Sequence, residues 1–314
     1  MKMRYSILFF DVMGNIIMQC GETENSLFFD KWGIAFIGEQ VDDRTTESSV
    51  FCRKQANITS TISYNPNSAE ISVNNTDKIY VDNFPNYIKS NYDLSKNIII
   101  DSTSINVAVF LILIQALYDS GTKKVDVLYL QPRHYHNTNK SKWERRSFDL
   151  SKQFDGFIGI PGQSLYLSRR DKVVFLCGYE SERIERSFEE LNIDENRVYL
   201  LFGTPPYEAG WDMNAFSSHL GIIEQKGIHN NIYYCGAANP YSVMGKLDLI
   251  YSGLDTEEKL FLVPVGTKPM AIGACAFKVS KNDSSRISVL YDHPHVSKGR
   301  SMDIAMWNLY NIEF

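Results

Sequence analysis

The segment "FLVPVGTKPMAIGACAF" (261–277) places a lysine where an apolar strand pattern leads into a helical pattern of small residues. Gly266 lets the backbone approach a ligand closely, Thr267 offers a hydroxyl hydrogen bond, and Lys268 supplies an ammonium group. Pro269 suits the first turn of a helix, whose free N–H groups point toward the same place. This chemistry suits a phosphate. A capped helix with a solvated lysine is the alternative, and the residues alone leave both open.

A second polar turn follows the apolar run in "IIIDSTSI" (98–105). Ser102, Thr103 and Ser104 offer three consecutive hydroxyls where a strand gives way to a helix. One hydroxyl suffices to cap that helix, so the others are candidates for binding a ligand. Asp101 directly precedes them and is a candidate general base.

A third turn, "CGYESERIER" (177–186), combines a glycine with charged residues. Gly178 again allows close backbone approach, and Tyr179 and Arg183 are candidate ligand-binding residues. Glu180 is the second candidate general base, although acids in this region also favour a helix N-terminus. Further candidate ligand-binding residues after strands are Gly203, Thr204 and Asn239.

The familiar cofactor and catalytic motifs are missing from the sequence. No Gly-x-Gly-x-x-Gly follows a strand, no Gly-x-Ser-x-Gly occurs, and the lysine turn lacks the P-loop spacing. The pairs His134/His136 and His293/His295 have spacing compatible with metal ligation, but only Asp292 lies near them as a carboxylate. We therefore expect neither a bound metal nor a cofactor.

The elements that position these turns alternate regularly from about residue 96 onward. "KNIIID", "KVDVLYL", "DKVVFLC", "RVYLLFG", "EKLFLVP" and "RISVLY" are apolar strand patterns, and helical patterns lie between most of them. Alternation of this kind, with nearly continuous apolar strands, is typical of a parallel sheet covered by helices. Ligands of such sheets bind beyond the carboxyl ends of the strands.

The first 95 residues show a different pattern. Short alternating runs such as "TSTISYN" and "AEISVNN" are separated by Asn, Pro and Ser, which indicates antiparallel hairpins. We predict an α/β protein with a Rossmann-like, mostly parallel sheet and helices on both faces in residues 96–314. Residues 1–95 would form a smaller β-rich subdomain.

Composition narrows the class of protein. The 314 residues are 44% hydrophobic and carry a net charge of −5 without long blocks of one sign, which argues against a broad nucleic-acid or lipid surface. No apolar run reaches the roughly 20 residues of a membrane-spanning helix. The five cysteines are far apart and mostly lie in apolar patterns, which indicates reduced, buried thiols. We expect a cytoplasmic protein.

Two of these turns together resemble a known family. "VGTKPMAIGACAF" and "DSTSI" are similar to motifs of the CARF and related Rossmann-like sensor domains of prokaryotic antiviral systems. The resemblance implies that the two turns meet near a dimer axis and hold a cyclic oligonucleotide. The pocket would then be lined by Ser102, Thr103, Ser104, Gly266, Thr267 and Lys268. The chain departs from the family in having Val265 where a further glycine is usual.

The functional expectation follows from phosphate-suited turns without an evident catalytic set. It is a nucleotide-sensing or partner-binding subunit of an antiviral defence or stress system, acting as a homodimer. No nuclease signature stands out, so an effector would lie on a separate polypeptide or would be contacted by the β-rich N-terminal part. The alternative is a hydrolase that processes a nucleotide or nucleoside with a strand-end carboxylate, Asp101 or Glu180, as the base.

Overall fold

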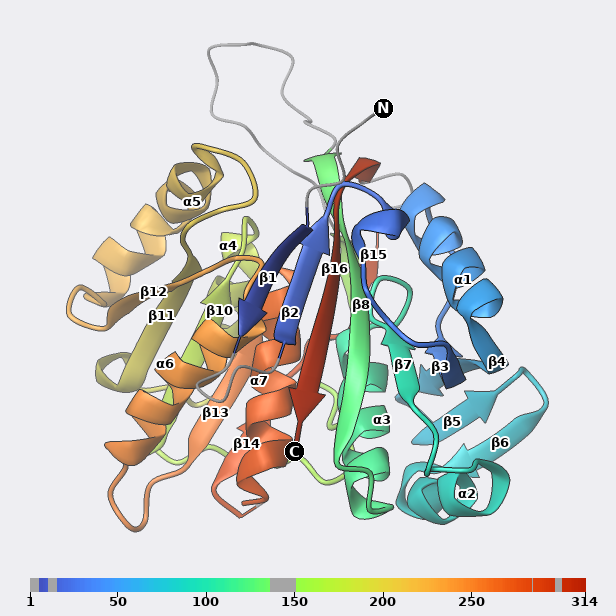
Figure 1. Cartoon of the computed structure of the whole chain (residues 1–314). Helices are drawn as coiled ribbons and strands as arrows, with labels where there is room; N and C mark the ends of the chain where they lie inside the picture. Colours follow the sequence, from blue (N-terminus) through green and yellow to red (C-terminus); the bar gives the residue numbers. More distant parts are fainter. Residues whose placement is uncertain (1–5, 11–15, 136–150, 284, 297–300) are drawn as a thin grey trace. The chain divides into compact units, whose positions relative to one another are not determined.

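The computed structural model describes residues 6–10, 16–135, 151–283, 285–296 and 301–314, and the statements below concern these residues. The chain forms two compact units (Figure 1). Unit 1 comprises Met1–His136 and Lys298–Phe314, and unit 2 comprises Asn137–Ser297. This division differs from the boundary expected near residue 95, because strands before and after that position belong to the same sheet.

Unit 1 contains a nine-stranded sheet in the order β1-β2-β16-β8-β7-β3-β4-β5-β6. Its strands are β1 (Ser6–Phe10), β2 (Ile16–Gly21), β3 (Trp32–Ile37), β4 (Ala56–Asn65), β5 (Glu70–Val73), β6 (Asp77–Tyr80), β7 (Ile98–Asp101), β8 (Lys124–Tyr135) and β16 (Ser301–Glu313). Its helices are η1 (Glu24–Ser26), α1 (Asp43–Gln55), η2 (Val81–Asn83), α2 (Phe84–Asn91) and α3 (Val107–Asp119).

The centre of this sheet is parallel and is built from two β-α-β units, β3-α1-β4 and β7-α3-β8. The two units extend the sheet in opposite directions from the β3/β7 pair, so right-handed crossovers place α1 and α3 on opposite faces. On the α1 face, Phe51 and Cys52 pack with Trp32, Ala35 and Leu128. The second unit matches the sequence prediction, whereas the first lies in the region predicted to contain only hairpins.

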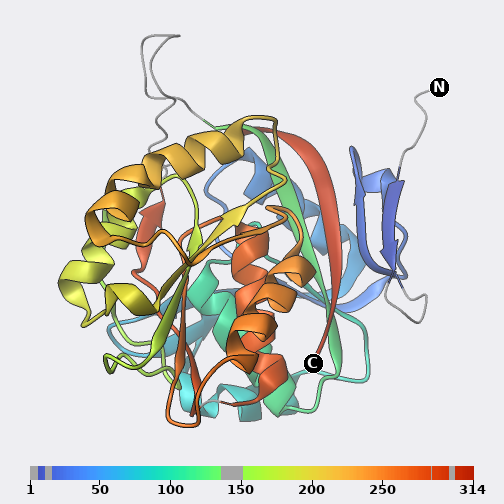
Figure 2. The same cartoon turned by 90° about the vertical axis from the view of Figure 1, so that its left-hand side faces the viewer.

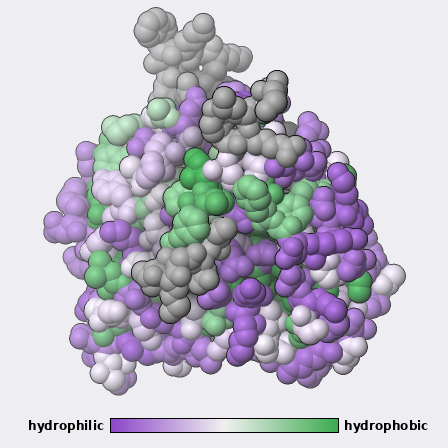
Figure 3. All heavy atoms as spheres, viewed as in Figure 1, coloured by the Kyte–Doolittle hydropathy of each residue, from purple (hydrophilic) through white to green (hydrophobic). Residues whose placement is uncertain are grey.

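The margins of the sheet are antiparallel. The β4-β5-β6 meander confirms the predicted hairpins, and the long C-terminal strand β16 pairs with β2 and β8. The edge strand β1 exposes the apolar side chains of Ile7, Phe9 and Phe10. Figure 3, viewed as in Figure 1, shows a green, apolar area over the β1–β2 hairpin.

Unit 2 contains a five-stranded, entirely parallel sheet in the order β12-β11-β10-β13-β14. Its strands are β10 (Lys172–Cys177), β11 (Val198–Gly203), β12 (Ile232–Cys235), β13 (Leu260–Pro264) and β14 (Ile287–Val289). Its helices are α4 (Ser181–Glu190), η3 (Glu195–Arg197), α5 (Trp211–Lys226), α6 (Pro240–Ser252) and α7 (Lys268–Lys281). A separate antiparallel pair consists of β9 (Ser151–Phe154) and β15 (Pro294–Val296).

Helices cover both faces of this second sheet. Ile184 of α4 and Ile222 of α5 pack in a core with Phe175 and Phe202 of the strands. Helices α6 and α7 lie side by side on the other face (Figures 1 and 2). The protein thus has the α/β, Rossmann-like fold predicted from the alternation of apolar runs.

Two further predictions concern the cysteines and the presence of a membrane-spanning helix. All five cysteines are buried and unpaired, which confirms the prediction of buried free thiols. Within the described ranges, no helix combines the length and the apolar character needed to cross a membrane.

Candidate functional site

The order of strands in unit 2 determines which turns become neighbours. Strands β10, β11 and β12 follow one another from the centre of the sheet to one edge. The chain then crosses back, and β13 pairs with the other side of β10. The switch point of the sheet therefore lies between β10 and β13, where open parallel sheets bind their ligands. The two turns that meet there are Gly178–Glu180 and Val265–Lys268.

Two glycines allow these turns to approach each other. A Cβ atom on Gly178 would lie 2.6 Å from the carbonyl oxygen of Val265, and one on Gly266 would lie 2.8 Å from the carbonyl oxygens of Leu176 and Cys177. These are backbone atoms that cannot rotate away. Both positions consequently require glycine, because the two turns approach each other closely, whereas the predicted role was close approach to a ligand.

Thr267 fixes the start of α7. Its Oγ1 accepts a hydrogen bond from the N–H of Met270 (3.4 Å) and donates one to the carbonyl of Ala237 (2.6 Å). Lys268 is the first residue of the helix and is half-buried, and Pro269 follows at a position where its missing N–H has no cost. The ammonium-bearing residue thus stands at the positive end of the helix dipole.

The loop after β12 joins the same edge. Ala237, which bonds to Thr267, also lies against Gly203: a Cβ atom on Gly203 would be 2.9 Å from that of Ala237. Thr204 donates its N–H to the carbonyl of Cys235 (2.6 Å). Asn239 caps α6 through its side-chain oxygen, so its carboxamide already has a structural function. The structure brings these predicted residues together with the Gly-Thr-Lys turn.

Aromatic side chains gather near the carboxyl ends of β10 and β11. Tyr179 contacts Trp211 edge to face with ring centroids 6.2 Å apart, and Tyr207 lies 6.5 Å from the same indole. Tyr179 and Tyr207 are half-buried and can offer part of a ring to a ligand. Tyr207 and Trp211 were not among the predicted site residues, because nothing in the sequence links the β11–α5 connection to Tyr179.

The charged residues of the β10 turn are bound within the protein. Arg183 is buried and forms two hydrogen bonds with the Asp292 carboxylate and a 3.5 Å ion pair with Glu180. Burial by itself would lower the pKa of Arg183, but these two carboxylates outweigh it and raise the pKa. Glu180 also accepts a hydrogen bond from Ser151 (3.3 Å). We therefore assign Arg183 and Glu180 to a structural network instead of to a ligand or a base.

The side chains of the hydroxyl-rich turn in unit 1 form hydrogen bonds within the protein. Asp101 is completely buried, and its Oδ2 atom accepts hydrogen bonds from Ser48 (2.8 Å), Ser49 (3.2 Å) and Ser104 (2.6 Å). Its Oδ1 atom accepts the N–H of Thr103 (3.1 Å). The role of general base is incompatible with this enclosed position, which is a correction to the sequence-based interpretation.

The remaining hydroxyls of that turn are bonded to the neighbouring strand. Ser102 donates to the carbonyl of Leu128 (2.7 Å), and Thr103 accepts the N–H of Leu130 (3.0 Å). The turn therefore ties β7 to β8. It ends a strand of the nine-stranded sheet, whereas the Gly-Thr-Lys turn ends a strand of the five-stranded sheet in the other unit. The two turns that carry the resemblance do not meet at the edge of one sheet.

No cluster of three or more His, Cys, Asp and Glu side chains that could hold a metal ion occurs among the residues with described positions. His293 donates a ring N–H to the carbonyl of Ile158 (3.2 Å), and His295 pairs with Asp155 (2.7 Å). The second member of the other predicted histidine pair, His136, lies outside the described residues.

Comparison with known proteins adds little to this geometry. No protein-family model and no curated protein matches the chain. Among solved structures, a periplasmic ribose ABC transporter from Conexibacter woesei DSM 14684 is similar over 81% of this chain and 70% of its own. The sequence identity is 11% and the TM-score is 0.24, values at which the likeness supports no argument about function.

Proposed function

We propose that unit 2 binds a nucleotide at its switch point and that the chain is a sensor subunit. The observation that carries the proposal is the strand order β12-β11-β10-β13-β14, which brings the Gly178 turn against the Gly266 turn. A phosphate would lie at the N-terminus of α7 beside Lys268, and a base would stack on the exposed parts of Tyr179 or Tyr207.

The proposal replaces the hydroxyl-rich turn of unit 1 with the Gly178 turn as partner of the Gly-Thr-Lys turn. It keeps the part of the CARF resemblance that concerns "VGTKPMAIGACAF". The carboxylates predicted as bases are hydrogen-bonded inside the protein, which favours binding over hydrolysis. A role in antiviral defence or stress, a homodimer and an effector on a separate chain belong to the same proposal.

Calorimetry with linear and cyclic oligonucleotides tests the site. We expect one of these ligands to bind, and a hundredfold excess over its dissociation constant to stabilise the protein by about 2.7 kcal/mol. Lys268→Ala should weaken binding roughly tenfold or more, since a hydrogen bond to a charged group contributes about 1.5–3 kcal/mol. Tyr179→Ala should also weaken the binding of ligands that carry a base, but not the binding of inorganic phosphate.

Lys281→Ala is the matched control. Lys281 lies in the last turn of the same helix and pairs with Asp248 on the surface, so its loss should not alter ligand affinity. Equal affinities in the Lys268→Ala and Lys281→Ala proteins would refute the site. Absence of binding to every nucleotide tested would refute the sensor function. Multi-angle light scattering with and without ligand tests the homodimer, for which twice the mass of one chain is expected.

A further inference from the structure

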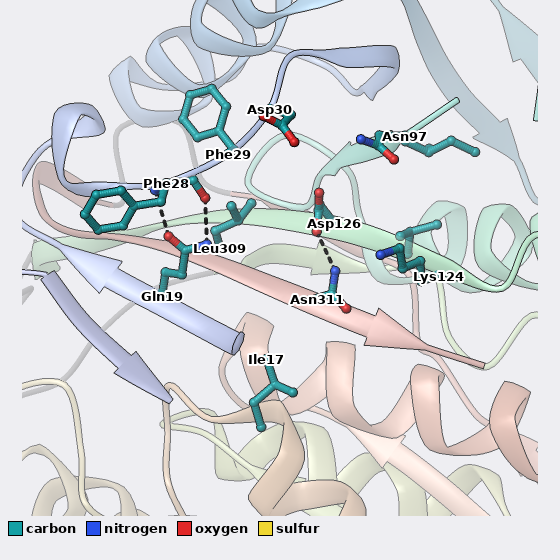
Figure 4. A pocket seen from close by; sticks show the side chains of 12 residues that line it. Ile17, Gln19, Phe28, Phe29, Asp30, Asn97, Lys124, Asp126, Leu309 and Asn311 are labelled. Atoms are coloured by element: carbon teal, nitrogen blue, oxygen red, sulfur yellow. Dashed lines mark hydrogen bonds between the residues drawn. The ribbon is translucent and has the colours of Figure 1, made fainter. Parts of the chain in front are cut away.

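A polar cavity of about 190 Å³ lies within unit 1, away from the turns considered so far (Figure 4). Asn97 and Ile98 at the start of β7 and Lys124 at the start of β8 contribute to its wall. Since β7 and β8 are parallel, the cavity is at the amino ends of these strands. This edge is opposite to the carboxyl ends of the strands, where ligands of open parallel sheets usually bind.

The cavity is formed by fixed groups. Its upper wall consists of residues 28–30, which precede β3. The side chain of Gln19 holds this segment by accepting the N–H of Phe28 (2.7 Å) and donating to its carbonyl (2.8 Å). Phe29 stacks on the buried indole of Trp32 with ring centroids 4.4 Å apart. The segment is therefore anchored at two successive residues above the sheet.

A carboxylate with neutral partners lies at the base of the cavity. Asp126 on β8 accepts hydrogen bonds from Trp32 Nε1 (2.7 Å) and from Asn311 Nδ2 (2.9 Å) on the adjacent strand β16. These donors orient the carboxylate without neutralising its charge. Burial raises the pKa of Asp126, and the two hydrogen bonds and the charge of Lys124 only partly oppose this effect.

The remaining wall adds a second carboxylate and further polar groups. Figure 4 shows the side chains of Asp30 and Asn97 extending toward Asp126 from the opposite side of the cavity. The charged lining residues are Asp30, Asp126 and Lys124, so two carboxylates and one ammonium leave one net negative charge. Phe29 and Leu309 provide an apolar surface beside these groups.

We propose that this cavity binds a small primary amine, with its ammonium group between Asp30 and Asp126 and its hydrocarbon part against Phe29 and Leu309. An ammonium group supplies three N–H donors and one positive charge. It thus matches an excess of acceptors and a net charge of the opposite sign. A charged donor between two carboxylates makes stronger hydrogen bonds than a neutral hydroxyl would. The proposal is independent of the nucleotide site in unit 2.

Calorimetric titration of the full chain with butylamine, 1-butanol and butyrate tests this inference. The three probes have similar hydrocarbon parts and differ in charge. We expect saturable binding of butylamine, and at least about tenfold weaker binding of the alcohol and of the anion. Asp30→Asn, a change at an exposed side chain that preserves its shape, should weaken butylamine binding about tenfold. Asp82→Asn, an exposed residue of η2 in the same unit, should leave binding unchanged.

Three results would overturn the proposal. They are no saturable binding of butylamine, binding of 1-butanol with equal affinity, or equal butylamine affinities for the Asp30→Asn and Asp82→Asn proteins. A titration with ribose adds a polyol probe, and a polyol that binds while butylamine does not would equally contradict it. Lys268→Ala should bind butylamine like the wild type, so failure of the nucleotide site and failure of the amine site can be distinguished.

Discussion

Arg183 and Asp292 form a doubly hydrogen-bonded ion pair that joins the first turn of α4 to the segment after β14. Both side chains are only 6% exposed, and the residues are 109 positions apart in the chain. Because β13 lies between β10 and β14, this pair spans the end of β13 beside the switch point. The geometry of the proposed nucleotide site therefore depends on a pair whose side chains bind each other instead of a ligand.

Removal of one partner should be costly, because it leaves the other charge buried without compensation. We expect Arg183→Ala to lower the free energy of unfolding by about 3–5 kcal/mol, measured by urea denaturation. Arg186→Ala is the control, since Arg186 pairs with Glu190 on the surface of the same helix. Its effect should be about 0–1 kcal/mol. Similar losses of unfolding free energy in the two variants would show that the buried pair contributes no more stability than the surface pair.

Gly266→Ala should disturb the contact between the two turns of unit 2. The added Cβ atom would meet the carbonyl oxygens of Leu176 and Cys177 at 2.8 Å, so the β13 turn must move. We expect a loss of about 1–3 kcal/mol in unfolding free energy, together with weaker nucleotide binding. Gly245→Ala is the control: Gly245 lies within α6 with no atom near its Cβ position, and alanine there should stabilise the helix by up to about 1 kcal/mol.

The buried carboxyl group of Asp101 should make stability depend on pH. Burial raises its pKa above the ordinary value of 3.8, and the hydrogen bonds from Ser104 and Ser48 only partly oppose this shift. The folded protein then holds the proton more tightly than the unfolded chain. The stability that this proton contributes is complete below the ordinary pKa and is lost as the pH rises through the folded pKa.

Comparison of the wild type with Asp101→Asn isolates this contribution. The wild-type unfolding free energy minus that of the variant should fall by up to about 1.4 kcal/mol per pH unit within the window and then level off. Urea denaturation at a series of pH values from about 4 to 8 measures it. A difference that stays constant over this range would show that Asp101 has the same pKa in the folded and unfolded states.

The five cysteines should be unreactive until the protein unfolds. All five are buried, and burial raises the pKa of the Cys235 and Cys275 thiols to about 12. Since the thiolate is the reactive form, an aromatic disulfide reagent at neutral pH should modify no thiol of the native protein and all five in denaturant. Rapid modification of one thiol under native conditions would identify a segment that opens locally.

Local sequence signals were sufficient for most elements of unit 2. The apolar runs at β10, β11 and β13 are short and continuous, and polar turns with glycine or a cap residue follow them. The helix start at Thr267 was likewise readable, because Thr followed by Lys-Pro is a favourable N-terminus. By contrast, α1 was missed, since its sequence "DRTTESSVFCRKQ" is polar and lacks a strong apolar periodicity.

No local pattern in the sequence predicts the cavity of unit 1. Asp30, Asn97, Asp126 and Asn311 come from four separate segments, and each looks like an ordinary surface residue in its local context. Asn311 lies beside Asp126 because β16 pairs with β8, and Asp30 and Asn97 precede β3 and β7 of the same sheet. A long-range pairing of this kind is decided by the match of whole strand faces and not by a local motif.

Local sequence patterns predicted the class of fold, the burial of the thiols and the start of a helix at the Gly-Thr-Lys turn. These properties follow from the composition and spacing of neighbouring residues. Long-range packing, by contrast, brings this turn against Gly178 and places the hydroxyls after Asp101 in hydrogen bonds within unit 1. The physical reason is that local periodicity specifies a strand but not its neighbours: strand order is set by packing between segments far apart in the chain.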